Sequence, residues 1–256
     1  MKMKSLVALT LAVFSFVTLA ATSTPKGFTD NMDEALAQAK TSGKYIYACF
    51  SGSDWCGWCK KLEREVFSDK TFDFAAALEK DFVLVFIDSP RDKSLLSDHA
   101  KANNKKITKK YKIQGYPTAL VLDSNGEQFA ETGYRSGGAK SYVEFLMDIR
   151  KKGPEGVKAA EAAEKAVFGK FDEKFEGYGS KINETLRAGK DVALLIPGAQ
   201  ALLKEAEALT VPEAMTAKKD DRVKMAQRMI AWLERRSAAQ KRAAEKKASQ
   251  KKSETK

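Results

Sequence analysis

The sequence predicts an α/β fold, a mixed sheet with helices on both faces, followed by an all-α C-terminal region. Residues 45–50 and 82–88 are runs of aromatic and apolar residues, the second ending at Asp88, and such runs are typical of strands buried on both faces. The segments around them, and most of the region from Glu155 to Arg236, instead repeat apolar residues three and four positions apart, which predicts helices. From Ser237 the apolar content falls to alanine, so the tail is expected to be a solvated helix or disordered.

The elements of the first half follow from local signals. Asp30 is expected to cap a helix that ends at Gly43. Helical spacing of apolar residues predicts further helices over residues 60–67 and 71–80. The polar segment 89–112 is expected to be helical only in pieces.

A β-hairpin is predicted over residues 119–132. Two short strands, 119–122 and 128–132, flank the sequence Asn125-Gly126, whose residues tolerate the positive φ angles of a tight turn. An amphipathic helix over residues 139–151 then completes the α/β region.

The first residues have the pattern of a cleaved signal peptide. Lys2 and Lys4 precede an uncharged apolar run over residues 6–19, and Ala20 and Ala21 supply small residues for cleavage. That run is shorter than the roughly 20 residues of a spanning helix, so an N-terminal membrane anchor is the weaker alternative. We therefore expect an exported protein, periplasmic or secreted.

The chain is thus expected to have four regions. These are a signal peptide (1–21), the α/β domain (27–152), a helical region (153–236) and a basic solvated tail (237–256). Gly153-Pro154 punctuates the chain where the composition changes.

The formal net charge of +11 is concentrated at the C-terminus. From Arg235 onward nine basic residues face two glutamates, and no aromatic residue follows Trp232 to stack on bases. We expect no nucleic-acid partner, and at most a weak contact of the tail with an anionic surface.

Cys56 and Cys59 form a Cys-x-x-Cys pattern between a predicted strand and a predicted helix. At a helix N-terminus, unpaired N–H groups and the helix dipole favour the thiolate, which is the nucleophile in thiol–disulfide exchange. Cys56 is the natural attacking sulfur, and Cys59, one turn along, is placed to resolve the mixed disulfide.

A structural zinc site would need two more ligands. The chain offers only Cys49 and His99 for that purpose, so we expect no metal and no cofactor. Cys49 lies inside an apolar strand, where it is either a small buried hydrophobe or a third redox sulfur that reacts with Cys59. The first interpretation is favoured, and His99 is interpreted as a lone surface histidine.

These residues carry a family resemblance. Residues 53–61 (SDWCGWCKK) resemble the active-site stretch of the thioredoxin-like superfamily, most of all the exported bacterial group that includes the reductase domain of periplasmic thiol-disulfide interchange proteins. Residues 115–118 (GYPT) resemble the cis-proline loop of that fold, and the match covers residues 27–152. It implies catalytic Cys56 and Cys59, with substrate bound at Trp55, Gly57, Trp58, Tyr116 and Pro117.

Two departures limit what the resemblance implies. Thioredoxins carry a buried acidic residue on the strand before the site, and here Cys49 occupies that position. Glu63 or Asp54 could take over proton transfer through water. The dipeptide Gly57-Trp58 leaves the redox direction open, with the resemblance favouring a reductase.

We therefore expect a protein-disulfide oxidoreductase that exchanges its Cys56–Cys59 pair with exported proteins and is recycled by a membrane or periplasmic redox partner. The alternative is a non-catalytic thioredoxin-fold module that binds peptides and uses the disulfide for structure. The reactivity of the Cys56 thiol distinguishes the two functions, because a catalytic pair needs a selectively reactive Cys56 and a peptide-binding module does not.

Overall fold

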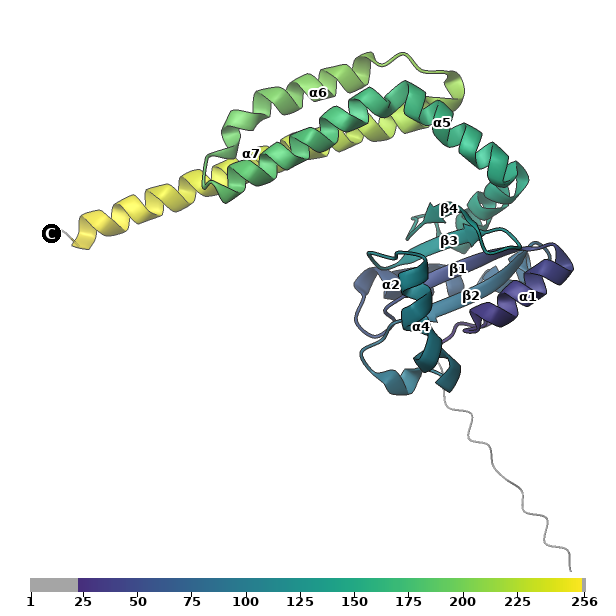
Figure 1. Ribbon diagram of the computed structural model, residues 1–256. Helices are drawn as coiled ribbons and strands as arrows, with labels where there is room; N and C mark the ends of the chain where they lie inside the picture. Colours follow the sequence, from purple (N-terminus) through teal and green to yellow (C-terminus); the bar gives the residue numbers. More distant parts are fainter. Residues whose placement is uncertain (1–22, 255–256) are drawn as a thin grey trace, which may run out of the picture. The chain divides into compact units, whose positions relative to one another are not determined.

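The computed structural model describes residues 23–254, so the expected signal peptide lies outside the described residues (Figure 1). These residues form two compact units, one ending at Val157 and the other beginning at Lys158. Between residues 23 and 254 no helix is both long and apolar enough to cross a membrane.

Four strands form one mixed sheet in the first unit. The strands lie in the order β2-β1-β3-β4, with β1 parallel to β2 and the other two pairs antiparallel. In the parallel pair Ser51 lies opposite Asp88, so both strands end at the same edge of the sheet. The strands are β1 (Tyr45–Ser51), β2 (Phe82–Asp88), β3 (Thr118–Leu122) and β4 (Gln128–Thr132).

Alternate residues of β1 face two separate cores. Tyr47 and Cys49 belong to one, and Ile46, Ala48 and Phe50 to the other. This confirms the predicted mixed sheet with helices on both faces. The first core is covered by α2 (Gly57–Leu62), the π-helical turn η1 (Glu63–Phe67), α3 (Phe74–Leu78) and the first part of α5 (Gly138–Arg187). The second is covered by α1 (Met32–Ser42) and α4 (Asp98–Lys110).

The predicted cap of α1 was wrong by one residue. The Asn31 side chain accepts the N–H groups of Asp33 and Glu34. Asp30 instead accepts a hydrogen bond from the Ser97 hydroxyl, which in turn caps α4. Asp and Asn both cap helices well, so the sequence alone did not show whether Asp30 or Asn31 is the cap.

As expected, residues 89–112 are helical in pieces, a short 3-10 turn η2 (Lys93–Leu95) and helix α4, but the second piece is longer than the sequence indicated. Helix α4 is continuous over thirteen residues. Its inward face carries small and polar residues, Ala100 and Asn104, with Ile107 packed against the second core. A face this poor in large apolar residues gives almost no periodic signal.

The predicted hairpin joins β3 to β4. Gly126 has a φ of 83°, and the Asp123 carboxylate accepts the N–H groups of Asn125 and Glu127 across the turn. Helix α5 then begins at Gly138 and loses helical geometry at Gly153, whose φ is 63°.

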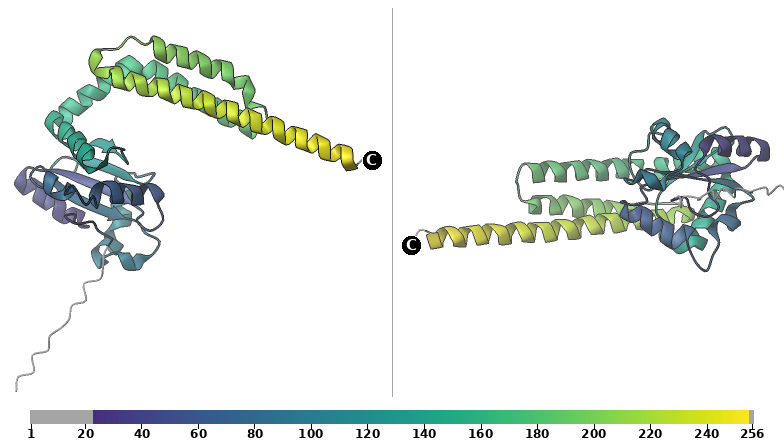
Figure 2. Two further views of the ribbon diagram at one scale, coloured as in Figure 1. Left: turned by 180° about the vertical axis from the view of Figure 1, so that it is seen from behind. Right: turned by 90° about the horizontal axis from the view of Figure 1, so that it is seen from below.

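The second unit contains only helices among its described residues. The last part of α5, α6 (Ile196–Ala208) and α7 (Thr216–Glu254) lie side by side in both views of Figure 2. Ile182, Leu195 and Leu233 meet in their shared core, and Arg222 of α7 pairs with Asp172 of α5 at 2.6 Å. The side chains of residues 241–250 are exposed along α7.

Candidate functional site

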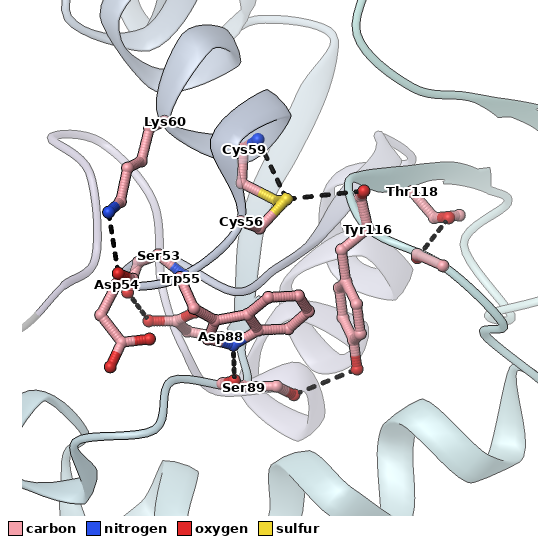
Figure 3. The surroundings of a disulfide bond; sticks show 11 residues. Ser53, Asp54, Trp55, Cys56, Cys59, Lys60, Asp88, Ser89, Tyr116 and Thr118 are labelled. Atoms are coloured by element: carbon pink, nitrogen blue, oxygen red, sulfur yellow. Dashed lines mark hydrogen bonds between the residues drawn. A yellow bond between two sulfur atoms is a disulfide. The ribbon is translucent and has the colours of Figure 1, made fainter. Parts of the chain in front are cut away.

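The two cysteines lie where β1 passes into α2. Cys56 is the N-cap residue of α2, and a disulfide joins it to Cys59, with 5.2 Å between the Cα atoms. The N–H group of Cys59 lies 3.2 Å from Cys56 Sγ and donates to it (Figure 3). Cys56 is 7% exposed and Cys59 only 3%, so Cys56 is the more accessible sulfur.

The second motif faces the first across the edge of the sheet. The Tyr116–Pro117 peptide bond is cis, and it immediately precedes β3. The carbonyl oxygen of Tyr116 lies 3.5 Å from Cys56 Sγ, and the Tyr116 hydroxyl is bonded to Ser89 Oγ at 3.3 Å. Figure 3 shows the Tyr116 carbonyl facing Cys56 Sγ, while the Tyr116 ring extends away from Cys56 toward Ser89.

Contacts with Ser89 and Tyr116 hold the Trp55 side chain in place. Its indole N–H donates to the Ser89 carbonyl at 3.0 Å, and its ring meets that of Tyr116 edge to face, 5.6 Å between centroids. Gly52 lies directly beneath the ring, because a Cβ there would come within 2.4 Å of it. Trp55 thus has a structural role, and its side chain is also 40% exposed beside the disulfide.

Trp58 belongs to a different surface. It is 58% exposed, and its ring lies 5.3 Å from that of Tyr134. Lys61 Nζ lies over both rings, and Tyr134 donates to the Glu65 carboxylate at 2.6 Å. A Cβ built on Gly57 would meet no atom within 4 Å apart from its chain neighbours and the backbone of its own helix.

Asp88 was not among the predicted site residues, yet it anchors the loop before Cys56. It is 2% exposed at the end of β2. Its carboxylate accepts the Ser53 N–H at 2.9 Å, the Ser53 hydroxyl at 2.5 Å and the Ser23 hydroxyl at 2.6 Å. A charged residue that ends an apolar run of a parallel strand is the sequence signal that could have revealed it.

Cys49 is a free thiol buried beneath the site. Burial raises its pKa far above the usual range, and the nearby charges of Asp88 and Glu63 raise it further. The thiol is therefore protonated at neutral pH, which favours its interpretation as a buried hydrophobe.

The two carboxylates considered for proton transfer differ in their surroundings. Asp54 accepts the N–H groups of Arg91 and Asp92, and these bonds, that of Asp92 first, lower its pKa. Glu63 is half-buried, and burial followed by the charge of Asp88 raises its pKa. Glu63 also follows Cys59 by four residues, so the two share one face of the helix. Glu63 is the better placed of the two.

Among residues 23–254, no three His, Cys, Asp or Glu side chains lie close enough together to hold a metal ion. His99 lies partly buried on α4, with the Asn103 side-chain amide beside its ring.

The chain is similar in sequence to known thioredoxin-like proteins. The family model of a thioredoxin-like domain matches residues 32–141. Disulfide bond reductase DsbH of Chlamydia pneumoniae is 32% identical over 118 residues, 46% of this chain and 69% of that protein. Thiol:disulfide interchange protein DsbD of Salmonella paratyphi A is 32% identical over 102 residues, 39% of this chain but only 15% of that protein. The solved structure of a DsbH oxidoreductase is 25% identical, covers 56% of this chain and 95% of its own, and has a TM-score of 0.44.

The fold and the cysteine site define a thioredoxin-like oxidoreductase. This chain belongs to the thioredoxin-like family of thiol–disulfide oxidoreductases.

Proposed function

We propose that the protein is a disulfide reductase in which Cys56 attacks the disulfides of exported proteins and Cys59 completes the exchange. The surroundings of Cys56 Sγ carry this proposal. The Cys59 N–H group, 3.2 Å away, is placed to stabilise a thiolate at the start of α2. The relative DsbH is named a disulfide bond reductase, which favours the reducing direction.

Each cycle transfers two electrons. The Cys56 thiolate attacks one client sulfur, the client S–S bond breaks, and the departing client thiolate takes up a proton. Cys59 then loses its proton and attacks Cys56 Sγ, which releases the second client thiol and leaves the Cys56–Cys59 disulfide. A dithiol of a membrane or periplasmic redox partner returns the two electrons and two protons.

The proposal assigns client binding to Trp55, Gly57, Trp58, Tyr116 and Pro117. Trp55 and Trp58 are exposed at 40% and 58%, and Gly57 leaves room beside the disulfide for a client segment. Pro117 positions the Tyr116 carbonyl 3.5 Å from Cys56 Sγ, where the main chain of an extended client segment could also pair.

Export and domain roles complete the proposal. Residues 1–21 serve as a cleaved signal peptide, and the protein works in the periplasm or outside the cell. Residues 27–152 are the catalytic domain, followed by the helical region 153–236 and the basic tail 237–256. The relative DsbD is named a thiol:disulfide interchange protein, which supports a redox partner of that kind.

Trapping a client tests the proposal. In Cys59→Ala the resolving sulfur is absent, so Cys56 should remain joined to a client in a mixed disulfide. The complex should form with a purified disulfide-containing protein and dissolve on adding dithiothreitol. The double variant Cys49→Ala/Cys59→Ala should form as much of the mixed disulfide as Cys59→Ala does. Cys56→Ala should form none. Absence of a complex from Cys59→Ala would favour the non-catalytic peptide-binding alternative.

A further inference from the structure

A groove along α4 begins at the active site and is not used by the chemistry above. It has a volume of about 840 Å³. Ser89 and Tyr116 line it as well as contacting Trp55, so the groove is continuous with the surroundings of Cys56. Leu96 and Ile113 give it apolar walls. We call it the α4 groove.

The α4 groove is strongly basic. Five lysines line it, and Asp88, buried and bonded to Ser53, is its one acidic residue. Lys105, Lys109 and Lys112 have no ion-pair partner between residues 23 and 254. An anionic ligand would therefore meet uncompensated positive charge there.

The side chain of Asn104 leaves a buried hydrogen-bond acceptor that a ligand's N–H group could satisfy. The residue is 4% exposed, and its amide nitrogen donates to the Asp88 carbonyl at 2.9 Å. Within the described chain its Oδ1 atom is buried without any hydrogen-bond partner. Buried acceptors are almost always satisfied, so a ligand that brings an N–H group into the groove would remove a penalty.

We propose that the α4 groove binds an acidic, extended segment of the client polypeptide, adjacent to the disulfide that Cys56 attacks. A polypeptide supplies the three features that the groove requires: carboxylates for Lys105 and Lys109, a main-chain N–H for Asn104 Oδ1, and an apolar side chain for Leu96 and Ile113. The inference rests on the proposed function only in naming the client as the source of the segment.

Binding of a short cysteine-free peptide rich in Asp and Leu to the oxidised full chain tests this. Saturable binding is expected, weaker at high salt. The double variant K105E/K109E should lower the affinity about tenfold, from reversed charge at two partly screened contacts. The control K106E/K110E makes the same charge change on the same helix, at lysines that do not line the groove, and should bind like the wild type.

A second readout is the Asn104 side-chain amide in an NMR spectrum, which should shift on binding in the wild type. No saturable binding, or equal losses in the two double variants, would overturn the proposal. Citrate binding as tightly as the peptide would assign the groove to small anions and would overturn the polypeptide occupant. Because this binding involves no thiol exchange, its failure is distinct from a failure of Cys59→Ala to trap clients.

Discussion

The Asp88 carboxylate binds both the backbone N–H and the hydroxyl of Ser53, at 2.9 and 2.5 Å. This pair ties the loop that leads to Cys56 to the end of the neighbouring parallel strand. The position of the attacking sulfur therefore depends on a buried carboxylate that takes no part in the exchange itself.

Ser53→Ala should weaken this anchor. It removes one hydrogen bond to a buried charge, so we expect the free energy of unfolding to fall by about 1–3 kcal/mol. Ser94→Ala removes an exposed hydroxyl bond to Asp92 and should cost less than about 0.5 kcal/mol. Denaturant unfolding of the oxidised protein measures both, and equal effects would show that the anchor is unimportant.

Gly52→Ala should displace Trp55. The new Cβ would lie 2.4 Å from the indole ring, so the ring must move away from Ser89 and Tyr116. We expect a loss of about 1–3 kcal/mol in stability and a shift in tryptophan fluorescence. Gly57→Ala is the matched control, since its Cβ meets no atom within 4 Å. An unchanged spectrum in Gly52→Ala would contradict the packing described for Trp55.

Cys49 should make stability depend on alkaline pH. Burial raises the pKa of this thiol in the folded protein, so the folded state keeps its proton where the unfolded chain releases it. Its contribution is complete below the ordinary thiol pKa of about 8.5 and is lost as pH rises above that value. In the oxidised protein, unfolding free energy should fall by up to about 1.4 kcal/mol per pH unit more than in Cys49→Ala. Parallel curves between about pH 8.5 and 10 would refute this.

Glu63 should carry the proton that Cys59 gives up. Burial raises the pKa of the Glu63 carboxyl, which brings it closer to the working pH of a general base. Glu63→Gln should slow the release of a mixed disulfide by Cys59 by about tenfold or more and flatten its pH profile. Glu65→Gln is the control on the same helical turn, because Glu65 is hydrogen-bonded to Tyr134, which lowers its pKa. Identical profiles for Glu63→Gln and the wild type would exclude this role.

Much of the site was predictable because its two motifs are local in sequence. Cys56 and Cys59 follow a buried strand, and Tyr116-Pro117 precedes another, so pairing those strands brings the motifs together. The strands were predictable for the same reason, since β1 and β2 are continuous apolar runs buried on both faces.

The parts that sequence did not predict depend on contacts between distant segments. The burial of Asn104 follows from the packing of α4, whose inward face has no large apolar stripe. The contact of Trp58 with Tyr134 depends on the path of the loop after β4. The choice between Glu63 and Asp54 depends on which carboxylate is occupied by backbone N–H groups, and spacing carries no such information.

The reduction potential of the Cys56–Cys59 pair, equilibrated against glutathione and dithiothreitol, tests the central claim most directly. The account predicts a value near that of thioredoxin, about −270 mV, as expected for a reductase. A value near −120 mV would make the protein an oxidant of folding clients, and one well below about −300 mV would make the disulfide structural. Either of these results would contradict the proposed function.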